Sequence, residues 1–310
     1  MIFYDVNAFS SDPASGNPAG VVICDNNIHP SDNQMQQIAA EVGYSETAFL
    51  VVDGKHVHAR YFTPVSEVDL CGHATIASFK ALLDAGLVSA GQDYTLHAKA
   101  GLLNIKVEHN FISMEAAPGR VLSTVKNPDS LKLIYGSLGT DYNPVKIMPA
   151  CNTFINMDPM VVTAGVPFLV VPINGEKILG ELKPNLELIR EISIGLKCSG
   201  IYCFAFEKYD VGTMAHCRGF YPLLGIDEEC ATGTGVAALS HYLNGYGMLP
   251  ANREALYIQG EAMGRPSQLT VYIKQDAQIV NGVSGPSDAP KHILVGGDAV
   301  IVSKHEISID

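Results

Sequence analysis

The stretch Arg60–Pro64, which reads RYFTP, is followed after six residues by Cys71, and the same arrangement returns in the second half of the chain. There Arg218–Pro222 reads RGFYP and is followed after seven residues by Cys230. Each cysteine leads into a turn of small residues that contains glycine, and then into a nearly uncharged stretch of helical length. The sequence therefore predicts a duplicated module in which each half delivers one cysteine to an equivalent place.

The stretches that follow the cysteines predict the fold. Residues 73–83 contain one charge, Lys80, and residues 232–249 contain none. A helix that is apolar all round is normally buried inside its domain. Short β-branched and aromatic runs, separated by turn residues, surround both stretches and favour antiparallel strands. We predict an α+β fold of two pseudo-symmetric domains, each a mostly antiparallel β-sheet rolled around a central α-helix, with the cysteine at the N-terminus of that helix.

The length of 310 residues suits two domains of about 150 residues each. Residues 116–144 are rich in Pro, Gly, Asn and Ser and form the predicted crossover. We expect a first domain over residues 1–130 and a second over 131–291, with a C-terminal strand at about 292–310 returning to the first. Early in the chain, Ser31 is predicted to cap a helix that Gly43 closes.

Composition limits the classes of function. The net charge of −12 argues against nucleic-acid binding, which usually needs a basic face. No apolar run reaches membrane-spanning length, and Met1–Asp5 lacks the basic start of a signal peptide, so we expect a cytoplasmic protein that does not enter a membrane. Seven cysteines without a CxxC pair indicate reduced thiols rather than disulfides.

A cysteine at the start of a helix has a chemical use. The unpaired N–H groups and the positive dipole end attract a carboxylate and lower the pKa of a thiol. Small residues such as Gly72, Ala74 and Gly233 let a substrate approach the backbone. If Cys71 removes a proton beside a carboxylate and Cys230 returns one on the opposite face, a stereocentre is inverted without any cofactor.

Several stretches resemble the diaminopimelate epimerase superfamily, and specifically its phenazine-biosynthesis isomerase (PhzF-like) branch. The resemblance implies two similar domains, each a sheet rolled around a central helix, with the active site in the cleft between them. It also implies that Glu46 is the general acid/base, that His73 and Glu229 assist it, and that Thr234 helps to hold the substrate. The matching stretches are Gly16–Val21, Ser45–Phe49, Arg60–Pro64, Asp69–Thr75, Arg218–Pro222 and Gly264–Ser267.

The chain departs from the PhzF-like pattern at one place. That pattern reads Glu-Asp-Pro-x-Thr-Gly-Ser, whereas residues 228–234 read Glu-Glu-Cys-Ala-Thr-Gly-Thr. Cys230 resembles the cysteine in the Ala-Cys-Gly-Thr-Gly turn of epimerases and racemases that use a cysteine pair, and Cys71 resembles their first catalytic cysteine. The chain thus resembles the PhzF-like branch in most of its motifs, and it resembles the racemases that use a cysteine pair at Cys71 and Cys230.

The leading hypothesis is a cofactor-independent isomerase, a racemase or epimerase of an amino acid that does not use pyridoxal phosphate, with Cys71 and Cys230 as its two bases. The small carboxylate-bearing substrate is expected to contact Gly72, Ala74, Glu229, Thr232, Gly233 and Thr234. An alternative is a PhzF-like isomerase of a conjugated acid, with Glu46 as the proton shuttle. A third hypothesis is a non-catalytic carboxylate-binding protein.

Metal and cofactor sites are weakly supported by the sequence. A metal site built from the residues Cys71, His73, His216, Cys217 and Cys230 lacks zinc-finger spacing. The glycine-rich turn at 232–235 lacks both the GxGxxG pattern and the Lys-Ser/Thr end of a phosphate loop. We therefore expect no metal and no cofactor. The resemblance is compatible with a homodimer.

Overall fold

The computed structural model describes residues 1–24, 30–148, 154–206, 212–249, 252–274, 277–280, 283–286 and 292–307. The chain forms two compact units. Unit 1 comprises Met1–Glu115, Gly264–Gln268 and Gly296–Asp310, and unit 2 comprises Ala116–Met263 and Leu269–Val295. The chain first passes from one unit to the other after Glu115, whereas the sequence led us to expect a division after residue 130.

Unit 1 is a mixed sheet with a helix on each face. Its elements are β1 (Ile2–Ala8), β2 (Asn17–Ile23), α1 (Asp32–Val42), β3 (Thr47–Asp53), β4 (His56–Phe62), β5 (Glu67–Val68), α2 (Gly72–Asp84), β6 (Gln92–Ala98), β7 (Gly101–Val107), β8 (Ile112–Ala116) and β22 (Ala299–Glu306). The strands pair in the order β22-β1-β2-β3-β4-β6-β7-β8, and β5 pairs with the end of β4. Only β2–β3 and β4–β6 are parallel among these pairs.

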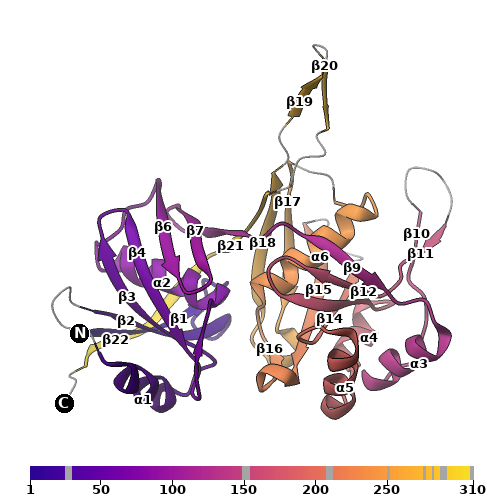
Figure 1. Cartoon of the computed structure of the whole chain (residues 1–310), viewed down its shortest axis with the longest axis horizontal. Helices are drawn as coiled ribbons and strands as arrows, with labels where there is room; N and C mark the ends of the chain where they lie inside the picture. Colours follow the sequence, from indigo (N-terminus) through magenta and orange to yellow (C-terminus); the bar gives the residue numbers. More distant parts are fainter. Residues whose placement is uncertain are drawn as a thin grey trace. The chain divides into compact units, whose positions relative to one another are not determined.

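The two helices of unit 1 differ in burial because their sequences differ. The nearly uncharged α2 packs against β1, β2, β3 and β22 (Figure 1). Most of its side chains are buried. The amphipathic α1 buries Met35 and Ala39 against Phe62 and other aromatic and aliphatic residues of the sheet. Tyr61, the neighbour of Phe62 in β4, instead bonds to Thr75 of α2. Because successive residues of a strand face opposite sides, the sheet separates α1 from α2.

Unit 2 repeats this plan. Its elements are β9 (Arg120–Thr124), α3 (Pro128–Ser137), β10 (Lys146–Ile147), β11 (Ile155–Asn156), β12 (Met160–Thr163), β13 (Pro167–Pro172), α4 (Glu176–Glu181), α5 (Leu186–Leu196), β14 (Ile201–Phe206), β15 (Thr213–Tyr221), the 3₁₀ turn η1 (Pro222–Leu224), β16 (Ile226–Glu229), α6 (Gly233–Gly245), β17 (Glu254–Gln259) and the 3₁₀ turn η2 (Glu261–Met263). The main sheet has the order β9-β12-β13-β14-β15-β17, with β16 at the end of β15. The pairs β13–β14 and β15–β17 are parallel, and they correspond to the parallel pairs β2–β3 and β4–β6 of unit 1.

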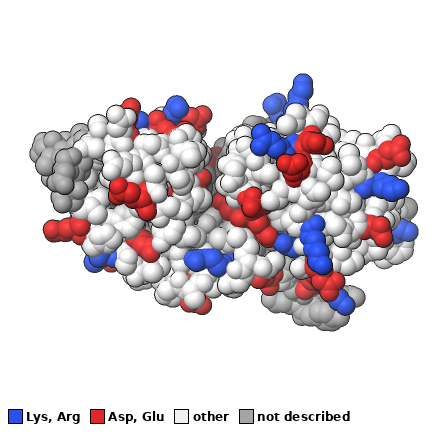
Figure 2. Space-filling model, turned by 90° about the horizontal axis from the view of Figure 1, so that it is seen from below, with Lys and Arg blue, Asp and Glu red and all other residues white. Residues whose placement is uncertain are grey.

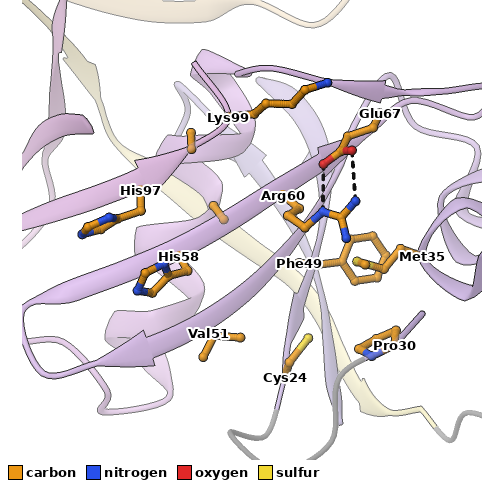
Figure 3. Close-up of a pocket in the computed structure, with 12 residues that line it drawn as sticks. Cys24, Pro30, Met35, Phe49, Val51, His58, Arg60, Glu67, His97 and Lys99 are labelled. Carbon is orange, nitrogen blue, oxygen red and sulfur yellow. Dashed lines mark hydrogen bonds and ion pairs between the residues drawn. The ribbon is translucent and has the colours of Figure 1, made fainter. Parts of the chain in front are cut away.

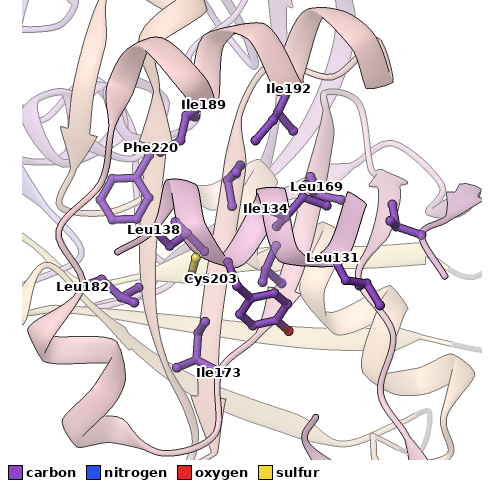
Figure 4. Close-up of a cluster of buried hydrophobic side chains, with 14 of the residues drawn as sticks. Leu131, Ile134, Leu138, Leu169, Ile173, Leu182, Ile189, Ile192, Cys203 and Phe220 are labelled. Atoms are coloured by element: carbon purple, nitrogen blue, oxygen red, sulfur yellow. The ribbon is translucent and has the colours of Figure 1, made fainter. Parts of the chain in front are cut away.

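The central helix of unit 2 is α6, which packs against β9, β12 and β13. The other face of the sheet is covered by α3 and α5, and Figure 4 shows the apolar side chains gathered there, among them Phe220, Cys203 and Ile189. The remaining strands are β18 (Ser267–Lys274), β19 (Ala277–Val280), β20 (Val283–Pro286) and β21 (His292–Gly297), of which β19 and β20 form a hairpin ladder. The predicted α+β fold, with two similar halves that each surround a helix, is confirmed.

Charged side chains of both signs lie on the surface, whereas the described cysteines are buried. On the face shown in Figure 2, the described Lys and Arg side chains are dispersed among Asp and Glu. Among the described residues, no helix is both long and apolar enough to span a membrane. The six described cysteines are buried and form no disulfide with one another, and Cys151 lies outside the described residues.

Candidate functional site

Five of the residues predicted for the site lie together at the N-terminus of α2: Glu46, Cys71, Gly72, His73 and Ala74. Cys71 is the N-cap residue of the helix, and His73 lies in its first turn. Glu46 immediately precedes β3, one of the strands on which α2 packs. The fold therefore brings a carboxylate, a thiol and an imidazole to the start of one buried helix.

The imidazole of His73 is the centre of this group. Its Nε2 atom lies 3.4 Å from Oε2 of Glu46 and 3.3 Å from Oγ of Ser45. Its Nδ1 atom lies 3.4 Å from Sγ of Cys71. A ring N–H also donates a hydrogen bond to the backbone carbonyl of Pro18. These contacts fix the orientation of the ring, and it presents nitrogen atoms to both the carboxylate and the thiol.

All three side chains of the group are buried. The exposed fraction is 9% for Glu46, 7% for Cys71 and 3% for His73. Burial lowers the pKa of His73, although the nearby Glu46 charge and the hydrogen bond to Pro18 act in the opposite direction. The imidazole is therefore neutral at pH 7. Within the described part of the chain, Oε2 of Glu46 is buried and accepts no hydrogen bond, because its 3.4 Å approach to His73 lacks hydrogen-bond geometry.

The other five predicted residues lie at the N-terminus of α6: Glu229, Cys230, Thr232, Gly233 and Thr234. Here the N-cap is Thr232, whose hydroxyl donates to Oε2 of Glu229 at 2.7 Å. The same hydroxyl accepts hydrogen bonds from the Tyr221 hydroxyl and from Nε2 of Gln259, both at 3.0 Å. This set of bonds holds Thr232 and Glu229 in fixed positions.

Sequence reasoning missed Gln259, which organises the start of α6. This amide has no exposed surface, and its Oε1 accepts from the Thr232 amide at 3.1 Å and from the Tyr202 hydroxyl at 2.9 Å. Its Nε2 also donates to the Glu229 carbonyl at 2.7 Å. The only signal in the sequence is a glutamine that ends the apolar run of β17, which is too weak to indicate a role.

The two cysteines do not occupy equivalent places. Cys71 is the N-cap of α2, but Cys230 lies two residues before Thr232, the N-cap of α6. The prediction that a cysteine stands at the start of each central helix is thus confirmed for Cys71 and wrong for Cys230. The turn before the strand that leads to the cysteine has four residues in both units, but β16 of unit 2 has four residues whereas β5 of unit 1 has two, and β16 pairs with β15 through a register shift. In the helix register, Thr232 corresponds to Cys71, and Thr234 corresponds to His73.

The position of Glu46 likewise carries a carboxylate in only one half, although Glu229 lies near the start of α6. In unit 1 the Gly20 amide donates to the Glu46 carbonyl at 3.2 Å, and in unit 2 the Leu169 amide donates to the Gly200 carbonyl at 3.0 Å. These bonds occupy the same place in the two parallel strand pairs, so Gly200 is the counterpart of Glu46. A Cβ atom on Gly200 would lie 2.2 Å from the Phe220 carbonyl oxygen, which leaves no room for a side chain.

A separate pocket of about 570 Å³ lies on the α1 side of the unit 1 sheet, and none of the predicted site residues lines it. Its wall combines apolar side chains, including Phe49, with His58, His97 and Arg60 (Figure 3). Arg60 binds Glu67 through two parallel hydrogen bonds of 2.8 and 3.0 Å, as Figure 3 shows. Since its guanidinium is already paired, Arg60 has a structural role in this pocket.

Comparison with known proteins agrees with this architecture. Residues 6–305 match the model of the phenazine biosynthesis-like proteins, PhzC-PhzF. An uncharacterized isomerase of Escherichia coli K12, YddE, is 30% identical, and the alignment covers 99% of this chain and 98% of the relative. A crystal structure of a PhzF-family protein of Bacillus anthracis has a TM-score of 0.83 at 25% identity and covers 100% of this chain and 99% of its own.

A hydroxyproline epimerase of Agrobacterium vitis shares the fold, with a TM-score of 0.60 at 16% identity over 99% of this chain and 90% of its own. The epimerase and this chain thus share the duplicated sheet around central helices. The chain belongs to the phenazine biosynthesis-like family, and it is an isomerase.

Proposed function

We propose that this isomerase moves a proton within a small carboxylate-bearing molecule and that Glu46 carries the proton. The observation that supports this proposal is the buried Oε2 atom of Glu46, which accepts no hydrogen bond from any described residue. A buried carboxylate oxygen without a donor is costly, and it is a strong acceptor for a proton of a bound substrate. Such atoms are expected at sites that act on a substrate rather than at sites that only stabilise the fold.

The start of α2 supplies a binding place for the substrate carboxylate. The first N–H groups of a helix have no partner within the helix, and they carry the positive end of its dipole. Gly72 is the first residue of α2, and a Cβ atom placed on it would have only Met114 Sδ, at 3.9 Å, within reach. A carboxylate can therefore approach the backbone at Gly72 and His73 closely.

The proposed reaction needs no group beyond this site and the substrate. Oε2 of Glu46 takes a proton from a carbon next to, or conjugated with, the substrate carboxylate. The electron pair left on carbon delocalises into the carboxylate, whose developing charge is stabilised by the helix N–H groups. The protonated Glu46 then returns the proton to a different carbon of the conjugated system. The neutral ring of His73 lies 3.4 Å from Oε2 of Glu46 and borders the place where the proton is transferred.

The difference between the two halves supports one carboxyl base rather than two thiols. The counterparts of Glu46, Cys71 and His73 in unit 2 are Gly200, Thr232 and Thr234, none of which is a base near neutral pH. Of the other groups at the α6 start, Cys230 lies two residues before the N-cap, and the Glu229 carboxylate already accepts a hydrogen bond from Thr232. A single base that removes and returns the same proton predicts internal return. Part of the substrate's carbon-bound hydrogen should then appear in the product even in D₂O.

The test is hydrogen exchange in D₂O with small amino, hydroxy and unsaturated carboxylic acids, read by mass spectrometry and NMR. Glu46→Gln is expected to slow proton transfer by about 10²- to 10⁴-fold, the usual contribution of a general acid/base. Glu41→Gln, an exposed change at the end of α1, is the matched control and should retain full activity. Full activity in Glu46→Gln would refute the proposal.

The second candidate is the two-thiol racemase, and the observation in its favour is the contact of 3.4 Å between Cys71 Sγ and His73 Nδ1 at the N-cap of α2. It predicts complete exchange with solvent, inversion of an amino-acid α-carbon, and loss of both in Cys230→Ala. The Glu46 mechanism predicts that Cys230→Ala retains most activity. A non-catalytic carboxylate-binding protein would bind an acid and exchange none of its carbon-bound hydrogens.

A further inference from the structure

The group at the start of α2 has the composition of a metal site as well as that of a catalytic site. Glu46, Cys71 and His73 each offer one ligand atom, and these atoms all lie within 4.8 Å of one another. Across the described ranges, this is the one group of three His, Cys, Asp or Glu side chains so arranged. A carboxylate, a thiolate and an imidazole are the ligand types that zinc accepts, and three protein ligands leave a fourth position for water.

The spacing of the three atoms suits zinc. Bonds of about 2.0–2.3 Å in a tetrahedron place neighbouring ligand atoms about 3.3–3.6 Å apart. His73 Nε2 lies 3.4 Å from Glu46 Oε2 and 3.9 Å from Cys71 Sγ. Both separations are close to the tetrahedral values, and all three ligand atoms lie within 4.8 Å of one another, so side-chain shifts would bring them into the coordination distance of one ion.

The surroundings also have the features of a metal site. A ligating histidine usually donates its second N–H to a backbone carbonyl or a carboxylate, and His73 already donates a ring N–H to the Pro18 carbonyl. A Zn²⁺ ion neutralises one thiolate and one carboxylate, so the loaded site carries no net charge. That balance suits three side chains that are all buried.

We propose that Glu46, Cys71 and His73 bind one Zn²⁺ ion per chain and that the ion blocks the site. Zinc occupies the Oε2 lone pair that would otherwise accept the substrate proton, so bound zinc and proton transfer exclude each other. The binding part of this inference rests on the geometry of the three side chains alone. The inhibition part rests on the proposed function of Glu46.

Binding is measured first, on the reduced full-length chain, by calorimetry with Zn²⁺ and by competition with a chromophoric chelator. Co²⁺ serves as a spectroscopic substitute, since a thiolate-to-cobalt band in the near ultraviolet reports the Cys71 ligand directly. We expect one ion per chain. Affinity should fall at least about 10-fold in each of Cys71→Ser, His73→Asn and Glu46→Gln, and the cobalt band should disappear in Cys71→Ser.

Two variants outside the group are the matched controls. Cys24→Ala removes another buried thiol, whose pKa burial raises to about 11. His97→Gln disrupts the surface histidine pair in which His56 Nδ1 and His97 Nε2 lie 2.9 Å apart. Neither change should alter the affinity. The proposal would be overturned by any of three results: loss of zinc binding only in His97→Gln, retention of zinc binding in Cys71→Ser, or no stoichiometric binding at all. Circular dichroism identifies variants that have unfolded, and these are excluded.

Measurements of hydrogen exchange with and without zinc separate this inference from the proposed function. If the chain exchanges substrate hydrogens, stoichiometric Zn²⁺ should abolish the exchange, and a chelator should restore it. Exchange that continues with zinc bound would overturn the inhibition. If no acid shows exchange without zinc, the proposed function fails, while the calorimetric and cobalt results still decide whether the metal site exists.

Discussion

At the scale of single residues, the two helix starts are built by different chemistry. At the α2 start, Glu46, Cys71 and His73 lie close together, whereas at the α6 start the Glu229 carboxylate accepts a hydrogen bond from Thr232, which is held in turn by the amide of Gln259. A fully bonded buried network gives rigidity, and a buried acceptor without a donor gives reactivity. The structure has the bonded network at the start of α6 in unit 2 and the acceptor without a donor, Oε2 of Glu46, in unit 1.

Gln259→Leu tests the network at α6. The change removes all four hydrogen bonds of the amide and leaves the Thr232 amide, the Tyr202 hydroxyl and the Glu229 carbonyl to find other partners. At about 1–3 kcal/mol for each unsatisfied buried group, we expect the free energy of unfolding to fall by roughly 3 kcal/mol or more in urea titrations. Gln268→Leu, on an exposed position of β18, should change it little. Equal effects would contradict this account.

Residues differ in how far the sequence reveals them. Glu46 and His73 were predicted through a family resemblance, and the structure brings them within 3.4 Å of each other. Their roles remain predictions. Gln259 was not predicted, because a single polar residue at the end of an apolar strand has no pattern until the fold places Thr232 against it.

At the scale of secondary structure, helix ends were read from the sequence with mixed success. Ser31 and Gly43 bound α1 as expected, through a reciprocal capping box with Gln34 and a left-handed C-cap. The central helices were predicted because they lack charge, and the predicted stretch that starts at residue 232 begins at the N-cap of α6. The cysteine motif carries no information about the longer strand β16 and its register shift against β15, after which Cys230 lies two residues before that N-cap.

Ser31→Ala tests the cap of α1. Its hydroxyl accepts from the Gln34 amide, while the Gln34 side chain accepts from the Ser31 amide at 2.9 Å. Loss of such a cap costs about 1 kcal/mol of unfolding free energy, and Ser31→Thr should recover most of it. Chemical denaturation monitored by circular dichroism measures both. An unchanged midpoint in Ser31→Ala would show that the packing of Met35 and Ala39 alone determines the stability of α1.

At the scale of the whole molecule, the duplication is clear in the strand order and in one repeated ion pair. Arg60 binds Glu67 in unit 1, and Arg218 binds Glu228 in unit 2, each through two hydrogen bonds. Each guanidinium also lies about 5 Å from the ring of a phenylalanine two residues later. The repeat was predicted from the RYFTP and RGFYP stretches. The boundary between the halves was not located, because turn-rich composition marks a connection but not the first residue of a unit.

The repeated pair provides a matched comparison. The Arg218 side chain is 9% exposed and also donates to the Leu179 and Leu182 carbonyls, whereas that of Arg60 is 39% exposed. Arg218→Gln should lower the free energy of unfolding by about 3–5 kcal/mol, because it leaves the partly buried Glu228 carboxylate without its cation. Arg60→Gln should cost about 1 kcal/mol or less. Urea titrations of both variants measure the difference, and similar losses would contradict the role assigned to burial.

The pairing of β1 with β22 has a consequence for synthesis. Residues Ile2 to Ala8 find their antiparallel neighbour in Ala299 to Glu306, so all of unit 2 is translated between the two strands. A ribosome extends the chain at about 5–20 residues per second, so β1 keeps one edge open for many seconds. During that interval an unpaired edge is a template for pairing with another nascent chain. Unit 2, whose main strands are nearly contiguous in sequence, can fold while unit 1 is still waiting for its last strand.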